Sequence, residues 1–166
     1  MAEAPAAVVV VGIGNALRGD DAAGLQVARG VRSLLEPVRA RLQIAVLEHE
    51  REPLGLIDRW QGASATLLID AICSGAQPGT THRIDVSAAP IPAPLGSSSS
   101  THAVGLGEAI ELARALGRLP ATTVLYGIEG ASFDSGYALS SPVGAAVPTL
   151  AEAVAREAIQ AAATAA

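Results

Sequence analysis

The stretch VVVVGIGNALRGDD, residues 8–21, decides the fold of this 166-residue chain. Its four valines are β-branched and have no polar residue between them, which is typical of a strand buried on both faces of a sheet. Three glycines follow and permit a tight turn. Apolar residues then recur at helical spacing, so the stretch delivers Asp20 and Asp21 to the start of a helix.

The two adjacent carboxylates of this turn are predicted to take different roles. Asp20 is expected to cap the following helix, because a side-chain oxygen there satisfies amide groups that lack a partner within the helix. Asp21 is then the carboxylate available to bind a metal. A dinucleotide-binding fingerprint would need a glycine where the chain has Leu17, and phosphate is repelled by facing aspartates. The turn therefore favours a cation over a phosphate.

The composition predicts a single domain over residues 1–166. Half of the residues are hydrophobic and only 2% are aromatic, so a core of Ala, Val, Leu and Ile is expected. A net charge of −5 without a basic block argues against nucleic acid as the partner. The lone Cys73 excludes an intrachain disulfide and fits a reducing compartment. With no signal-like or membrane-spanning run in view, we expect a cytoplasmic protein that contacts no membrane.

Strand and helix patterns alternate along the chain and predict an α/β fold. The predicted strands cover 7–12, 43–48, 64–70, 81–86 and 122–127. The predicted helices cover 21–35, 54–61, 103–116 and 142–163. Helical connections imply three layers, with a twisted, mostly parallel, mixed five-stranded sheet between helices. The link between the third and fourth strands is too short for a helix, so we predict an antiparallel hairpin there.

Two more residues join Asp21 as candidates for one site. Asp70 ends an apolar strand, and ligands of α/β sheets bind beyond the carboxyl ends of the strands. His102 begins a helix after the Pro- and Ser-rich loop 87–101, which is long enough to be functional. Asp70 as a turn former and His102 as a solvent-facing residue stay open as alternatives. Two carboxylates and one imidazole suit zinc, nickel or iron.

Several motifs of the chain resemble, in the same order, those of the hydrogenase maturation proteases. They are the Gly-x-Gly-Asn…Gly-Asp-Asp turn at 12–21, Leu-Ile-Asp-Ala-Ile at 68–72, Pro-Gly-Thr at 78–80, His-Ala-Val-Gly-Leu at 102–106, Val-Leu-Tyr-Gly-Ile-Glu at 124–129 and Leu-Ser-Ser-Pro-Val-Gly-Ala-Ala-Val-Pro at 139–148. The resemblance implies an endopeptidase that removes the carboxyl-terminal peptide of a nickel-loaded [NiFe]-hydrogenase large-subunit precursor, and it implies a twisted sheet between helices.

The resemblance also assigns roles to residues. Asp21, Asp70 and His102 match the positions that contact metal in the family, and they are the expected catalytic residues. Either a metal polarises the scissile carbonyl or activates water, or the two aspartates act directly as acid and base. The expected metal is the nickel of the substrate, or another divalent ion in the isolated protein. We expect a monomer whose partner is the hydrogenase precursor.

The expected substrate-binding residues are Gly14, Asn15, Glu48 and His49, the last because it follows the second strand and can line the same crevice. Where the family often carries Asp-Gly-Gly-Thr after the second strand, this chain has Glu-His-Glu-Arg at 48–51, which suggests a different subgroup of hydrogenase partners. Asp21 also replaces the glutamate that the family can carry. Two other classes stay open: a non-catalytic, nickel-dependent checkpoint protein, and a nucleoside- or phosphate-binding enzyme.

Overall fold

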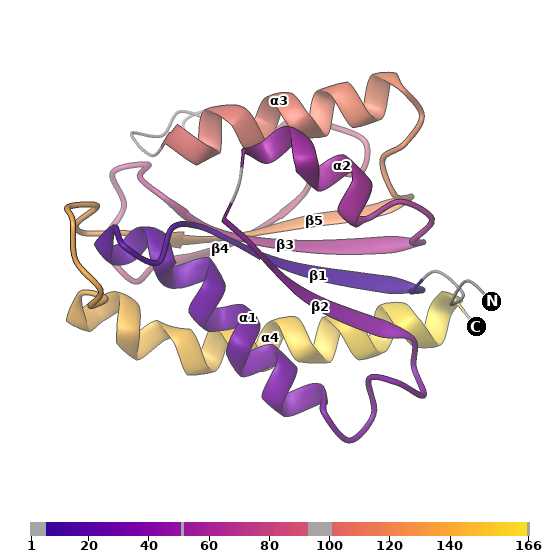
Figure 1. The fold of residues 1–166 in the computed structure, drawn as a ribbon, viewed down its shortest axis with the longest axis horizontal. Coiled ribbons are helices and arrows are strands. Elements are labelled where there is room, and N and C mark those ends of the chain that lie inside the picture. The colour runs from indigo at the N-terminus through magenta and orange to yellow at the C-terminus, as the bar shows by residue number, and fades with distance from the viewer. Residues whose placement is uncertain (1–5, 51, 93–100, 166) are drawn as a thin grey trace.

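The computed structural model describes residues 6–50, 52–92 and 101–165, without the side chains of 101–104. In this part of the chain, five strands form one mixed sheet in the order β2-β1-β3-β5-β4 (Figure 1). The strands are β1 (Val8–Ile13), β2 (Ile44–His49), β3 (Ala65–Ile72), β4 (Thr81–Asp85) and β5 (Thr122–Glu129). All pairs are parallel except β4 with β5. The predicted α/β class is confirmed.

Helices cover both faces of the sheet (Figure 1). On one face, α1 (Ala23–Leu35) and α4 (Ser141–Ala165) share an apolar core with alternate residues of the strands. On the other face lie η2 (Pro53–Gly55), α2 (Leu56–Arg59) and α3 (Thr101–Ala115) over a second core. This is the predicted three-layer arrangement. Among the helices of the described ranges, none is long and apolar enough to cross a membrane.

The predicted hairpin between the third and fourth strands is wrong. β4 pairs with β5 instead, in a register that sets Ile84 opposite Leu125, so β5 lies between β3 and β4. The linker passes the end of β5, where the Gly79 amide donates to the Glu129 carbonyl at 2.7 Å. Strands lie only about 4.8 Å apart, so even a short linker can step over one strand without a helix.

Close contact between α1 and the sheet depends on two facing glycines. A Cβ atom on Gly24 would lie 2.3 Å from the carbonyl oxygen of Ile13 and 2.4 Å from that of Ile69. A Cβ atom on Gly12 would lie 2.3 Å from the Gly24 carbonyl oxygen. These are backbone atoms, which cannot rotate away. The start of α1 is therefore held directly against the carboxyl ends of β1 and β3.

We expect Gly24→Ala to lower the midpoint of urea unfolding, although alanine favours helix by about 1 kcal/mol over glycine. The reason is the backbone clash with Ile13 and Ile69. Gly107→Ala in α3 is the matched control, because its Cβ would meet only the Ile91 side chain, at 3.9 Å. The control should unfold at an equal or higher urea concentration. Equal stabilisation of both variants would contradict the close approach.

Candidate functional site

Asp21 and Asp70 are brought together at the carboxyl end of the parallel strands. Asp21 lies in η1 (Gly19–Ala22), the short 3-10 helix that joins β1 to α1, and Asp70 lies near the end of β3. Both side chains are completely buried. They are near enough for the charge of Asp21 to act on Asp70. Two of the three predicted ligands therefore share one buried location.

The electrostatics of Asp70 are those of a carboxyl group held away from water. Burial, and secondarily the negative charge of Asp21, raise the pKa of Asp70 well above its usual range, and a contact with the Ala71 amide opposes this only in part. Two buried carboxylates cannot both be ionised at low cost. The pair therefore retains a proton or binds a cation, which is the behaviour expected of a metal-binding or acid–base site.

His102 lies in the first turn of α3. The helix α3 begins on the side of the molecule where the parallel strands end (Figure 1). Its side chain lies outside the described residues, as do residues 93–100 of the predicted functional loop 87–101. Among the residues whose side chains are described, no three His, Cys, Asp or Glu side chains are placed to hold a metal ion. Completion of the site by His102 stays a prediction.

The prediction that Asp20 caps its own helix is wrong. The helix that follows has no side-chain cap, and Asp20 instead binds the loop between β5 and α4. Its Oδ2 accepts the amides of Ala131 and Ser132 at 2.8 and 3.0 Å and the Ser140 hydroxyl at 2.8 Å, while Oδ1 accepts the Ser140 amide at 2.7 Å. These donors lie more than 110 residues away in the chain, so no local pattern shows them.

The four hydrogen bonds keep Asp20 ionised although it is fully buried. Burial alone would raise the pKa of Asp20, but the bonds from Ser140, Ala131 and Ser132 outweigh it and lower that pKa. A carboxylate with several amide donors behaves in this way. Adjacent aspartates therefore differ in role: Asp20 holds a loop in place, and the charge of Asp21 acts on Asp70.

The four residues expected to bind substrate lie in two places, the turn after β1 and the end of β2. Gly14 and Asn15 shape the turn, because a Cβ on Gly14 would come within 1.9 Å of the Asp21 carbonyl oxygen and Asn15 Oδ1 accepts the Leu17 amide at 2.9 Å. Glu48 is paired with two arginines of α1, at 2.8 and 3.1 Å. Substrate contact by these three residues stays a prediction.

His49 is buried at the end of β2, opposite Ile13 in register. Its Nε2 lies 3.0 Å from the Glu52 carbonyl oxygen, so this nitrogen carries the proton and donates it. Side chains of β1 alternate between the two cores, and Ile13 belongs to the core beneath α3. His49 therefore lies under the η2 segment that packs on α3. Its binding of substrate stays a prediction.

Glu129, at the end of β5, was not predicted as a site residue. It is 1% exposed, and its carboxylate accepts the Ser74 and Gly75 amides at 2.6 and 3.0 Å and the Ser74 hydroxyl at 2.9 Å. It thereby holds the start of the β3–β4 linker. The sequence pattern that pointed to Asp70, an acid at the end of an apolar strand, also describes Glu129.

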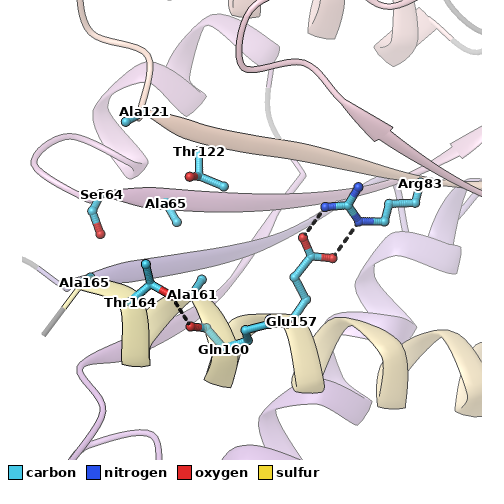
Figure 2. A pocket seen from close by; sticks show the side chains of 10 residues that line it. All are labelled: Ser64, Ala65, Arg83, Ala121, Thr122, Glu157, Gln160, Ala161, Thr164 and Ala165. Carbon is cyan, nitrogen blue, oxygen red and sulfur yellow. Dashed lines mark hydrogen bonds and ion pairs between the residues drawn. The ribbon is translucent and has the colours of Figure 1, made fainter.

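A pocket of about 430 Å³ lies elsewhere, at the opposite ends of the strands (Figure 2). It is formed by the amino ends of β3 and β5 and the last turns of α4, and neither Asp21 nor Asp70 lines it. Arg83 and Glu157 form an ion pair in its wall with contacts of 2.6 and 2.9 Å. Burial and a hydrogen bond to Glu157 raise the pKa of Tyr126 to about 12. This cluster fastens α4 to the sheet.

Comparisons with known proteins place the chain in a family. The family model for hydrogenase maturation protease matches residues 29–157. The chain is 34% identical over 123 residues to the hydrogenase expression/formation protein HoxM of Cupriavidus necator, covering 74% of this chain and 58% of that protein. It is 30% identical over 128 residues to HupD of Thiocapsa roseopersicina, covering 76% and 56%. The chain belongs to the hydrogenase maturation protease family.

Solved structures agree with this assignment. The [NiFe] hydrogenase maturation protease HybD from Thermococcus kodakarensis is 28% identical, with a TM-score of 0.70 over 91% of this chain and 98% of that one. HycI of the same organism is 26% identical, with a TM-score of 0.67 over 93% of each chain. The chain spans less than three fifths of the length of the two curated relatives. The family match includes Asp70 and His102, whereas Asp21 precedes it.

We expect Asp20→Ala to lower the free energy of unfolding by at least about 2 kcal/mol, because it leaves buried donors without an acceptor. The pKa of Asp20 is lowered by folding, so its contribution is present above about pH 4 and is lost as the pH falls through the folded-state pKa. Urea titrations at several pH values measure this. Glu152→Ala, an exposed acid of α4, should change stability little at any pH.

We expect Asp70→Asn to stabilise the metal-free protein increasingly as the pH rises from about 4 to 7. The pKa of Asp70 is raised by folding, so the folded protein keeps a proton that the unfolded chain loses above about pH 4. The wild-type contribution therefore falls with rising pH. Thermal unfolding in chelator tests this, with the exposed Asp58→Asn as control. A difference independent of pH would contradict the raised pKa.

Proposed function

We propose that this chain is an endopeptidase that removes the carboxyl-terminal peptide of a [NiFe]-hydrogenase large-subunit precursor once nickel has been inserted. The observation that carries the proposal is the buried pair of Asp21 and Asp70 at the ends of the parallel strands, in a member of this family. Burial and the charge of Asp21 raise the pKa of Asp70, so a bound cation stabilises the ionised form of that carboxyl group. The cation in question is part of the substrate.

In this proposal, nickel acts as the recognition signal. Asp21 and Asp70 bind the substrate's nickel, and His102 supplies a third contact from the start of α3. Carboxylate and imidazole groups suit nickel as ligands. In the free enzyme Asp70 holds a proton, because burial and Asp21 raise its pKa, and it loses this proton as nickel binds. A precursor without nickel lacks the charge that this pair needs and is not cleaved.

Hydrolysis then needs a water molecule activated beside the scissile peptide bond. A metal at the pair supplies polarisation of the carbonyl or a more acidic water. Without such a role for metal, the protonated Asp70 donates to the leaving amine and the ionised Asp21 accepts the proton of water. In both routes the C–N bond breaks, water supplies one oxygen of the new carboxyl group, and the leaving amine takes up a proton. We assign Gly14 and Asn15 to shaping the turn that bears Asp21.

The test is a processing assay in which the mass of the purified precursor is followed with and without nickel. We expect wild-type enzyme to shorten only the nickel-loaded precursor. Asp70→Asn and His102→Ala should reduce the rate at least about 100-fold, as loss of an acid–base or metal-binding group does. Asp58→Asn and Glu152→Ala, both exposed acids, are controls away from the pair and should leave the rate within about twofold.

Three outcomes would overturn parts of the proposal. Unchanged cleavage by His102→Ala would remove that residue from the site. Equal cleavage of nickel-free precursor would remove nickel as the signal. Nickel-dependent binding without any change in precursor mass would identify a checkpoint protein in place of a protease.

A further inference from the structure

The strand that carries Asp70 extends beyond one of its two neighbours. Pairing of β3 with β1 ends at Ile69. Pairing with β5 continues through Asp70 to Ile72, which lies opposite Glu129. In the described sheet, Asp70 therefore lies in a part of β3 that pairs with β5 alone. A strand end with one neighbour opens more readily than a strand end with two, so the position of Asp70 depends on how this end is fastened to β5.

Glu129 fastens the end of β3 with its side chain. Its Oε1 accepts the Ser74 and Gly75 amides at 2.6 and 3.0 Å, and its Oε2 accepts the Ser74 hydroxyl at 2.9 Å. The amide of the next residue, Gly130, donates to the Ile72 carbonyl oxygen at 2.9 Å. The last residue of β3 and the two residues that begin the linker proper are thus all bonded to the end of β5.

The segment 129–132 also holds the turn that bears Asp21. The amides of Ala131 and Ser132 donate to Oδ2 of Asp20 at 2.8 and 3.0 Å. The Asp20 amide donates in return to the Ser132 carbonyl oxygen at 2.9 Å. Since Asp21 follows directly, four consecutive residues connect the turn after β1 with the end of β3. The separation of the two acids of the candidate site is therefore set through this segment.

We propose that Glu129 is a positioning residue, which holds the Asp70 carboxyl group at the distance from Asp21 that the reaction needs. It is 1% exposed and both of its oxygens already accept hydrogen bonds, so it acts through the backbone and does not touch the substrate. This inference rests on the proposed function and adds to it a buried acid that no step described there uses. Groups that orient a ligand or an acid contribute about 10- to 100-fold to activity.

The hydrogen bonds of Glu129, and not its charge, give it this role. The donors are two backbone amides and one hydroxyl, which bond equally to the oxygen of a neutral amide. Nε2 of His82 lies 3.8 Å from Oε2 of Glu129, beyond hydrogen-bond distance. In Glu129→Gln the amide oxygen still accepts both N–H groups, and the NH2 group donates to the Ser74 hydroxyl, which turns to accept. Glu129→Ala leaves all three donors without their acceptor.

Glu157 offers a matched control at a distance from the two aspartates. Its carboxylate also has three donors, since it accepts two bonds from Arg83, at 2.6 and 2.9 Å, and one from the Tyr126 hydroxyl. Its removal loosens α4 from the sheet but leaves the bonds of segment 129–132 in place. Comparison with Glu157→Ala therefore separates a general loss of stability from a displacement of Asp70.

The first test measures kcat/KM for nickel-loaded precursor at a temperature at which every variant is folded. We expect Glu129→Ala to lower kcat/KM about 10- to 100-fold. Glu129→Gln and Glu157→Ala should stay within about threefold of the wild type. Wild-type activity of Glu129→Ala would overturn the proposal. An equal loss in Glu129→Gln would overturn it by assigning the effect to the charge, and an equal loss in Glu157→Ala by assigning it to stability.

A second set of measurements does not depend on activity. Hydrogen exchange of the Ser74 and Gly75 amides should be at least about tenfold faster in Glu129→Ala than in the wild type, and unchanged in Glu157→Ala. Crystal structures of the wild type and of Glu129→Ala, both grown with chelator, then give the distance between the Asp21 and Asp70 carboxyl groups. That distance should change by at least about 0.5 Å, and an unchanged distance would overturn the positioning role.

A milder variant keeps the test decisive if Glu129→Ala does not fold. Glu129→Asp is one methylene shorter and cannot reach both amides, so it takes the place of the alanine variant in every measurement. The two proposals also fail in different ways. If the wild type never shortens the precursor, the protease function fails, and exchange and the carboxyl distance still decide the role of Glu129. If the wild type cleaves and Glu129→Ala cleaves equally well, the positioning role fails alone.

Discussion

The buried carboxylate of Asp20 is the constraint on which the candidate site depends. A charge enclosed by protein is tolerated only when donors surround it, and here the donors come from residues 131, 132 and 140. The loop after β5 is therefore held against the turn after β1. Since Asp21 follows Asp20 directly, the same bonds fix the backbone that carries Asp21 to Asp70. The position of Asp21 therefore depends on the hydrogen bonds that its neighbour Asp20 accepts.

Three buried acids at this edge illustrate how surroundings decide the behaviour of one chemical group. Asp20 is ionised because donors outweigh burial. Glu129 has donors on both oxygens and holds the linker after β3. Asp70 has a raised pKa because burial and Asp21 act in the same direction. The acid that the fold leaves least compensated is the one suited to bind a cation or to transfer a proton.

Much of the fold was predictable because it follows from local patterns. The run of valines at 8–11 and the apolar run before Asp70 became strands buried on both faces, and the strand ranges agree to within about two residues. The strand order was less predictable. The linker between β3 and β4 is too short to hold a helix. Its length does not show that β4 lies beyond β5, because the path of the linker depends on contacts with Glu129 and on the free edge of β5 that β4 occupies.

The sequence by itself determined the alternation of strands and helices, the turn that carries two adjacent aspartates, and the position of an acid at the end of a central strand. These features depend on side-chain volume, branching and spacing along a few residues. Only the tertiary structure decided that Asp20 is a loop anchor, that Asp21 lies near enough to Asp70 for its charge to act there, and that Arg18 pairs with Gly136. Hydrogen bonds and charges act between groups near in space, and these partners lie some 50 to 120 residues apart in the chain.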